Sequence, residues 1–185
     1  MSEYRAGANP TQHEQNPRKP KNDGPWHPEK YQNILHEKAW AELKAAPYIW
    51  GTFVWCMFDF TSYWRNEGGV KGRNDKSLVT GDRTTKNDSF YFYKANWSDE
   101  PVLYITSRRH TERTNAVTEV KVYSNVKEVE LRVNGTSFGR RTTDGNAAFL
   151  WRDAQLKPGA NAIEASTTQS GRGLRDDCEW KLLPK

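Results

Sequence analysis

The chain has 185 residues, enough for one domain or two small ones, but its hydrophobic content of 35% and mean hydropathy of −0.96 supply little core for a free-standing globule. Its net charge is +5, yet the basic residues are interspersed with 23 acidic ones and form no long run, which favours a solvated surface over a nucleic-acid interface. No apolar stretch is long enough to cross a membrane, and the two distant cysteines, Cys56 and Cys178, fit no zinc-binding pattern.

The N-terminal part of the chain predicts a strand end, a loop and a helix. Residues 1–5 look like the end of a buried strand, and the Pro-, Asn- and Lys-rich segment 6–28 predicts a long irregular loop. Pro28 suits the first turn of a helix that Pro47 would end. The apolar stripe expected on this helix consists of Tyr31, Ile34, Leu35, Ala39 and Leu43.

A strand, a loop and a second helix follow. The run "YIWGTFVWC" at 48–56 is almost continuously apolar, which predicts a strand buried on both faces with Trp50 in the core. Residues 57–76 predict another long loop, 77–80 a short extended piece, and 86–97 a helix with an aromatic face. Two consecutive β/α units are typical of α/β barrels and doubly wound sheets, in which the loops after the strands carry the chemistry.

The pattern changes to short strands after Trp97. Strands are expected within 100–109, 118–125, 126–141, 147–156 and 161–168. Val129, Leu131 and Val133 alternate with charged neighbours, and Asn134-Gly135 is a strong hairpin-turn signal. The predicted fold class is therefore α/β plus all-β, with one domain over 1–97 and a small immunoglobulin-like β-sandwich over 98–185.

Three positions near the predicted strand ends could carry chemistry. Glu3 lies where a strand gives way to a loop, a place where carboxylates act as nucleophile or base, although a lone acid is usually only solvated. Trp55 ends the next strand, and its ring either offers a flat apolar face to a sugar or fills a core. The loop "GRNDKS" gathers Asn74, Asp75 and Lys76, which can bind hydroxyl or carboxylate oxygens or form an ordinary polar turn.

Several long blocks resemble bacterial family 2 glycoside hydrolases of the β-galactosidase type. They are Glu3-Tyr4 in "SEYRAGAN", "WGTFVWCMFDF", "NDKSLVTGDRTTKNDSFYFYKANW" and "EPVLYITSRR", and the similarity runs through nearly all of residues 2–109. Residues 100–185 resemble, more weakly, the β-sandwich that follows the barrel in those enzymes. The resemblance implies that 1–97 forms the last two β/α units of a TIM barrel.

The resemblance also implies a retaining mechanism and assigns roles to five residues. Glu3 matches the nucleophile, and Trp55 matches an aromatic platform beside the sugar. Asn74 and Lys76 match a loop that lines the sugar pocket, and His13 would reach a distal subsite. In β-glucuronidases of this family an Asn-x-Lys pattern binds the substrate carboxylate, so glucuronidase specificity is the alternative to a β-galactosidase-like one. No cofactor and no metal are implied.

The sequence also departs from the family pattern. The family's acid/base Glu belongs to an earlier barrel strand, and nothing marks Glu14, Asp59 or Glu67 as its substitute. Arg5 and Ser77 stand where the family usually has Gly, and Arg5 would either stabilise the charged nucleophile or crowd the pocket. We therefore expect the carboxy-terminal part of an exo-β-glycosidase, inactive alone, whose partners are a β-linked glycoside and the missing N-terminal portion.

A non-catalytic protein is the alternative from a different class. In that interpretation the sandwich at 98–185 is a sugar-binding or interaction module, and 1–97 is a degenerate remnant. Neither nucleic acid nor membrane is expected as a partner. The compartment stays open, with the periplasm or secretion as the expectation for a bacterial parent enzyme.

Overall fold

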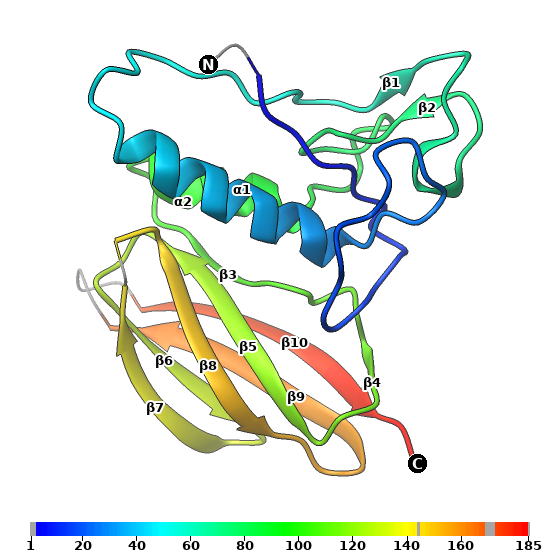
Figure 1. Cartoon of the computed structure of the whole chain (residues 1–185). Helices are drawn as coiled ribbons and strands as arrows, with labels where there is room; N and C mark the ends of the chain where they lie inside the picture. The colour runs from blue at the N-terminus through cyan, green and yellow to red at the C-terminus, as the bar shows by residue number, and fades with distance from the viewer. Residues whose placement is uncertain (1–2, 144, 169–172, 185) are drawn as a thin grey trace. The chain divides into compact units, whose positions relative to one another are not determined.

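The computed structural model describes residues 3–143, 145–168 and 173–184. The chain forms two compact units, Met1–Phe90 and Tyr91–Lys185, and the division between them falls inside helix α2, Asp88–Trp97 (Figure 1). In the part of the chain that the structure describes, neither helix is long and apolar enough to span a bilayer. The unit boundary lies a few residues before the expected domain boundary at 97/98, which stays a prediction.

The first unit contains little regular structure. Its elements are α1 (Glu29–Lys44), β1 (Phe60–Thr61), a 3-10 turn η1 (Glu67–Gly69), β2 (Arg73–Asn74) and the start of α2. The two helices confirm the predictions at 28–47 and 86–97 to within a few residues. Helix α1 begins directly after Pro28, whose extended backbone suits the position before a helix, and it ends three residues before Pro47.

Three extended segments of this unit run side by side in parallel. Tyr4 bridges Val54, and the Trp55 N–H donates to the Tyr4 carbonyl at 3.2 Å. The Cys56 N–H donates to the Lys76 carbonyl at 3.2 Å, and the Leu78 N–H donates back to Cys56 at 3.0 Å. This pattern is the slanted hydrogen bonding of a parallel ladder, and it aligns parts of the segments predicted at 1–5, 48–56 and 77–80. Residues 1 and 2 of the first segment lie outside the described residues.

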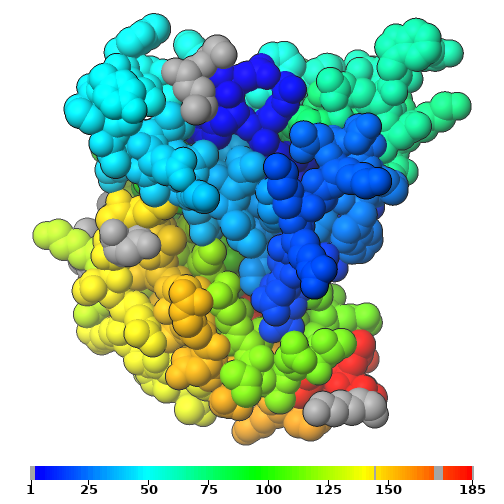
Figure 2. Space-filling model, viewed as in Figure 1, coloured from blue at the N-terminus to red at the C-terminus, as the bar shows by residue number. Residues whose placement is uncertain are grey.

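The segment 48–56 differs from its prediction. It forms a bridge at Val54 instead of a buried strand, and Trp50 is 94% exposed, so the expected core position for this ring is wrong. Tyr48 and Phe53 are exposed as well. The cyan side chains near residue 50 accordingly lie on the surface in Figure 2. An apolar run without period predicts burial only where other elements supply two covering faces.

Helix α1 buries a polar face in addition to one end of its predicted apolar stripe. Gln32, Asn33 and His36 are buried, whereas Ile34 is 40% exposed. The buried amides have defined partners, because Gln32 Nε2 donates to the Ala6 carbonyl at 2.9 Å and Asn33 Nδ2 donates to the Asp88 carboxylate at 3.2 Å. Of the predicted stripe, Leu43 is buried, Tyr31, Leu35 and Ala39 are half-buried, and Ile34 is exposed, so the stripe is confirmed only in part. Hydrogen bonds replace apolar contacts at the buried polar positions of the helix.

The second unit is a β-sandwich. Its strands are β3 (Leu103–Ile105), β4 (Glu112–Arg113), β5 (Val117–Ser124), β6 (Glu128–Val133), β7 (Thr136–Thr142), β8 (Ala148–Gln155), β9 (Gly159–Thr167) and β10 (Leu174–Leu182). One sheet has the order β4-β10-β9-β6-β7 and the other β3-β5-β8 (Figure 1). The apolar side chains between the sheets include Val120, Leu131, Trp151, Ile163 and Trp180.

Several predictions for this unit are confirmed. Val129, Leu131 and Val133 are buried, and Asn134-Gly135 connects β6 to β7 with positive φ at both residues. Strand β10 was not predicted, because its charged residues alternate with the inward-facing ones and resemble a polar tail. It pairs along its length with β9 and completes the larger sheet.

Candidate functional site

Glu3, Arg5 and Trp55 form one group at the ends of two paired segments. Arg5 Nη1 donates to Glu3 Oε1 at 2.7 Å, and the Arg5 guanidinium carbon lies 5.8 Å from the centre of the Trp55 ring. The parallel bridge between Tyr4 and Val54 brings the two ends to the same height. The structure thus brings together the predicted nucleophile and the predicted platform through the side chain of Arg5.

The alternation of an extended segment explains which side chains face out. Tyr4 is buried and packs against the ring of His36 at 5.6 Å between centroids, while Glu3 and Arg5 on either side of it are exposed. Burial lowers the pKa of His36 to about 3, so this ring is neutral at physiological pH. An inward tyrosine on a neutral ring therefore anchors the segment that presents Glu3.

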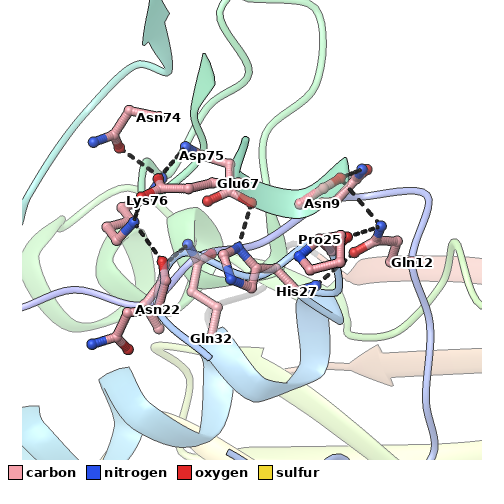
Figure 3. A network of polar contacts seen from close by, with 12 residues as sticks. Asn9, Gln12, Asn22, Pro25, His27, Gln32, Glu67, Asn74, Asp75 and Lys76 are labelled. Carbon is pink, nitrogen blue, oxygen red and sulfur yellow. Dashed lines mark hydrogen bonds and ion pairs between the residues drawn. The ribbon is translucent and has the colours of Figure 1, made fainter. Parts of the chain in front are cut away.

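Asn74 and Lys76 lie in a buried polar network (Figure 3). The Lys76 N–H donates to Asn74 Oδ1 at 3.2 Å. Lys76 Nζ forms an ion pair with Glu67 and donates to the Asn22 carbonyl at 3.1 Å. The predicted pocket residues are therefore ordered, and the ammonium of Lys76 already has a buried carboxylate beside it.

The carboxylate of Glu67 contacts two cations of this network. It is fully buried, and Arg65 contacts the same carboxylate as Lys76. Burial alone would raise its pKa, but hydrogen bonds and charge attraction from Lys76 and Arg65 outweigh burial and hold the pKa below its ordinary value. Glu67 is thus ionised at neutral pH, which does not suit an acid that must donate a proton. Its other oxygen accepts the Asp75 N–H at 3.3 Å.

A buried histidine–aspartate pair fixes the neighbouring loop. His27 Nδ1 lies 2.7 Å from Asp75 Oδ2, and His27 Nε2 lies 2.7 Å from the Lys21 carbonyl. Burial lowers the pKa of His27, but its hydrogen bond and charge attraction to Asp75 act more strongly and leave the pKa raised. Gly68 has φ of +59°, and a side chain on it would collide with Asp75, so glycine is required at this close approach.

The remaining predicted and candidate residues have contacts of their own or are partly buried. His13 is half-buried in the loop after Glu3, and Glu14 accepts a hydrogen bond from Trp26 Nε1 at 3.3 Å. The Ser77 hydroxyl donates to Asp59, and burial raises the pKa of that carboxyl to about 6. Asp59 lines a hollow of about 320 Å³ together with Arg73.

Sequence reasoning singled out Asn74 and Lys76 but missed the residues that hold them. The sequence marks Glu67 only as a possible substitute for the acid and gives no signal for His27, whereas the structure pairs Glu67 with Lys76 and His27 with Asp75. The signal that could have found them is weak, because each is a lone polar residue in a Pro- and Gly-rich loop. Among the described residues, no group of three or more His, Cys, Asp or Glu could hold a metal ion.

Comparisons with known proteins find similarity of the chain to glycosidases. Residues 115–174, within the sandwich, match a family described as a domain of unknown function, DUF4982. The homologues of the chain are glycoside hydrolases, both β-glucuronidases and β-galactosidases. A β-glucuronidase of Bacteroides fragilis is 40% identical over 178 residues, which cover 96% of this chain and 26% of that protein.

Solved structures of β-glucuronidases also superpose on the chain. The FMN-binding β-glucuronidase of Faecalibacterium prausnitzii L2-6 superposes with a TM-score of 0.88 at 38% identity, over 100% of this chain and 27% of that one. The β-glucuronidase 2 of Bacteroides uniformis, solved covalently bound to cyclophellitol-6-carboxylate aziridine, gives a TM-score of 0.82 at 28% identity, over 100% of this chain and 22% of that one. The chain thus spans about a quarter of the length of these relatives.

Proposed function

We propose that the chain contributes the carboxylate nucleophile and one wall of the sugar pocket to a retaining exo-β-glycosidase. The observation that carries the proposal is the group at the paired segment ends, where Arg5 contacts both Glu3 and Trp55. A carboxylate and an indole ring that both contact one guanidinium have the chemistry for attack on a sugar ring that lies on the indole. The kinship to β-glucuronidases and β-galactosidases agrees with this role.

In the proposed reaction Glu3 attacks the anomeric carbon of the sugar. A bond forms between a Glu3 carboxylate oxygen and that carbon, while the glycosidic C–O bond breaks and the leaving oxygen takes a proton from an acid elsewhere in the enzyme. Water then attacks the anomeric carbon and gives its proton to the residue that acted as the acid, while the bond to Glu3 breaks and Glu3 becomes a carboxylate again. The two inversions retain the configuration. The Arg5 guanidinium, which forms an ion pair with Glu3, must move aside for the sugar.

Two sugar specificities remain as candidates for the proposed site. A β-galactosidase-like enzyme makes no demand on the ammonium of Lys76, which is already paired with Glu67. A β-glucuronidase would place the substrate carboxylate near Asn74 and Lys76, whose Asn-x-Lys spacing fits that use. The relatives with 38–40% identity include both β-glucuronidases and a Bacteroides fragilis protein described as a β-galactosidase, so both specificities stay open.

The domain assignment is part of the proposal. Residues 1–97 would be the last two β/α units of a TIM barrel, and 98–185 an immunoglobulin-like sandwich that follows it. The parallel pairing of the segments at Tyr4, Val54 and Leu78 supports the first assignment. The partner would be the upstream portion of the enzyme, which supplies the proton donor, so the chain alone would hydrolyse nothing.

Covalent labelling tests the nucleophile. The chain is mixed with a polypeptide matching the upstream part of the Bacteroides fragilis relative and treated with cyclophellitol-type aziridines. Glu3 should form an ester with the ring carbon as the aziridine C–N bond breaks and the nitrogen takes a proton, and mass spectrometry of the digest locates the added mass. The aziridine with a 6-carboxylate should react faster than a galacto-configured one if the specificity is that of a glucuronidase.

Two matched variants control the labelling. Glu3→Gln should abolish the labelled peptide, whereas Glu14→Gln, in the same loop, should leave it unchanged. The chain without the upstream polypeptide should stay unlabelled. Label on a different carboxylate, or undiminished label in the Glu3→Gln protein, would refute the nucleophile assignment.

A further inference from the structure

The loop before α1 encloses a surface hollow of about 300 Å³ that the proposed catalytic role does not use. We call it the Trp26 hollow. Its lining includes Glu14, Arg18, Lys19, Lys21, Pro25 and Trp26. A volume of this size suits one or two sugar rings rather than a single ion.

The aromatic wall of the hollow is a fixed, half-exposed indole. Trp26 is 49% exposed, and its Nε1 donates to the Glu14 carboxylate at 3.3 Å. A tryptophan whose polar edge is already bonded presents its apolar face to a ligand. Such a face suits the C–H-rich side of a pyranose.

The loop that carries this indole is pinned at several backbone positions. The Gly24 N–H donates to the Lys21 carbonyl at 3.0 Å, and Gln12 Nε2 donates to the Pro25 carbonyl at 2.9 Å. The Lys21 carbonyl also lies 2.7 Å from His27 Nε2, within the buried network. The hollow is therefore pre-formed, so a ligand loses less free energy in ordering its walls.

The charged side chains that line the hollow indicate which class of ligand it binds. Arg18, Lys19 and Lys21 are exposed cations in its lining, while the one carboxylate there, Glu14, is bonded to Trp26. A guanidinium and two ammonium groups beside a flat apolar face favour an acidic group attached to a ring. A neutral sugar would use the indole but none of the three charges.

We propose that the Trp26 hollow binds an anionic oligosaccharide, with one ring on Trp26 and a carboxylate or sulfate facing Arg18 and Lys19. The choice of a saccharide over another anionic ring compound rests on the proposed glycosidase function. The hollow would hold an acidic sugar outside the proposed Glu3 pocket. It would thereby favour acidic glycans over neutral ones as substrates of the whole enzyme.

Calorimetric titration of the full chain tests this site without any catalysis. The probe is a hyaluronan tetrasaccharide, in which glucuronate alternates with N-acetylglucosamine, and the neutral comparison is chitotetraose. The acidic probe should bind roughly tenfold more tightly than the neutral one, and its affinity should fall with added salt. A sulfated chondroitin tetrasaccharide tests whether sulfate strengthens the contact with the cations.

Matched variants separate the hollow from other exposed rings. Trp26→Ala should weaken binding of the acidic probe by roughly tenfold or more, while Trp26→Phe keeps most of it. Trp50→Ala, which removes a ring that is 94% exposed, should bind like the unmodified chain. Arg18→Gln combined with Lys19→Gln should remove the preference over chitotetraose. A urea titration of each variant checks that the fold is kept.

The outcomes also separate this inference from the proposed function. Glu3→Gln should bind the acidic tetrasaccharide unchanged, because Glu3 is not among the residues that line the hollow. Equal binding of both tetrasaccharides, or equal losses in Trp26→Ala and Trp50→Ala, would overturn the Trp26 site even if Glu3 is labelled by the aziridine. Binding with the expected pattern but no label on Glu3 would leave the Trp26 site and overturn the nucleophile.

Discussion

Glu67 and Lys76 are two opposite charges that share a buried site, so each depends on the other. Both are almost completely inaccessible to solvent, and Arg65, which also contacts Glu67, is 39% exposed. Removing the carboxylate leaves the ammonium buried without its counter-charge. Such a change lowers the free energy of unfolding by about 3–5 kcal/mol, whereas removing a partly exposed ion-pair partner lowers it far less.

We predict that Glu67→Gln lowers the free energy of unfolding by about 3 kcal/mol, while Arg65→Gln lowers it by less than about 1 kcal/mol. Urea titration followed by circular dichroism measures both. The double change Glu67→Gln with Lys76→Met should recover much of the loss, because no uncompensated charge is then buried. Similar losses in the Glu67 and Arg65 variants would show that the pair is not the source.

The lowered pKa of His36 predicts how acid changes the stability of the first unit. Its pKa falls from 6.5 to about 3 on folding, because burial penalises the charged ring. Between these values the unfolded chain binds the extra proton, so this group lowers the stability of the folded state as pH falls below 6.5. The expected loss is about 1.4 kcal/mol per pH unit.

The measurement compares the unmodified chain with His36→Gln, which cannot titrate there. The difference between their unfolding free energies should change in favour of the variant as pH falls from neutral towards 4.5, because only the unmodified unfolded chain gains the proton. A difference that stays constant over this range would mean that the folded ring takes up the proton too. His27, with a raised pKa, acts in the opposite direction and is present in both proteins.

At the scale of single residues, the sequence predicts which segment ends lie side by side, but not which side chains bind Lys76. The parallel bridge between Tyr4 and Val54 aligns the two segment ends, and Arg5 there contacts both Glu3 and Trp55. The partner of Lys76 could not be predicted in this way. Glu67 reaches it from an irregular loop, and no periodicity links residues in such a loop.

At the scale of elements, the turn between β6 and β7 is set by Asn134 and Gly135. Their φ values are +51° and +77°, the combination that a two-residue hairpin turn needs to match the twist of its strands. Space is not the constraint at Gly135, since nothing lies within 4 Å of where its side chain would be. Any cost of a side chain there is therefore a cost of backbone conformation.

We predict that Gly135→Ala destabilises the sandwich unit by about 1 kcal/mol, because a positive φ is energetically unfavourable for alanine. Gly173→Ala is the control, since glycine there has no positive φ and its nearest neighbour would lie at 3.8 Å. Thermal unfolding of the two variants gives the comparison. Equal melting temperatures would indicate that the turn relaxes to another type.

The sandwich strands were predictable because a period of two reports burial on one face directly. Val129, Leu131 and Val133 show it. The same logic failed for β10, where Arg175, Asp177 and Glu179 occupy the outward positions and leave few apolar residues to count. It also failed for α1, since buried amides such as Gln32 carry no hydrophobic signal at all.

At the scale of the whole molecule, the two units are stabilised by different means. The second unit has a contiguous apolar core that includes Leu131, Phe149 and Trp151. The first unit buries mainly polar groups, among them Gln32, Glu67 and Lys76, in hydrogen bonds and ion pairs. Burial of apolar surface is the larger favourable contribution to folding, so the second unit should be the more stable one.

Hydrogen exchange followed by mass spectrometry or NMR would measure this difference in the intact chain. The amides of Val120, Leu131 and Ile163 should exchange at least roughly tenfold more slowly than those of Trp55 and Leu78. All five lie in hydrogen-bonded segments, so exposure of the amide alone does not produce the contrast. Uniform protection across both units would instead indicate one cooperative structure.

The anchoring of the first segment also bears on how such a chain changes in evolution. Tyr4 is fixed to Val54, and the Ala8 N–H is fixed to the Asp75 carbonyl at 3.0 Å. Loss of a single residue between these two anchors would shift the earlier residues by half a pleat and turn Glu3 towards the interior. One in-frame deletion would therefore bury the proposed nucleophile while leaving the helices and the sandwich intact, so the proposed role of Glu3 is lost without loss of the fold.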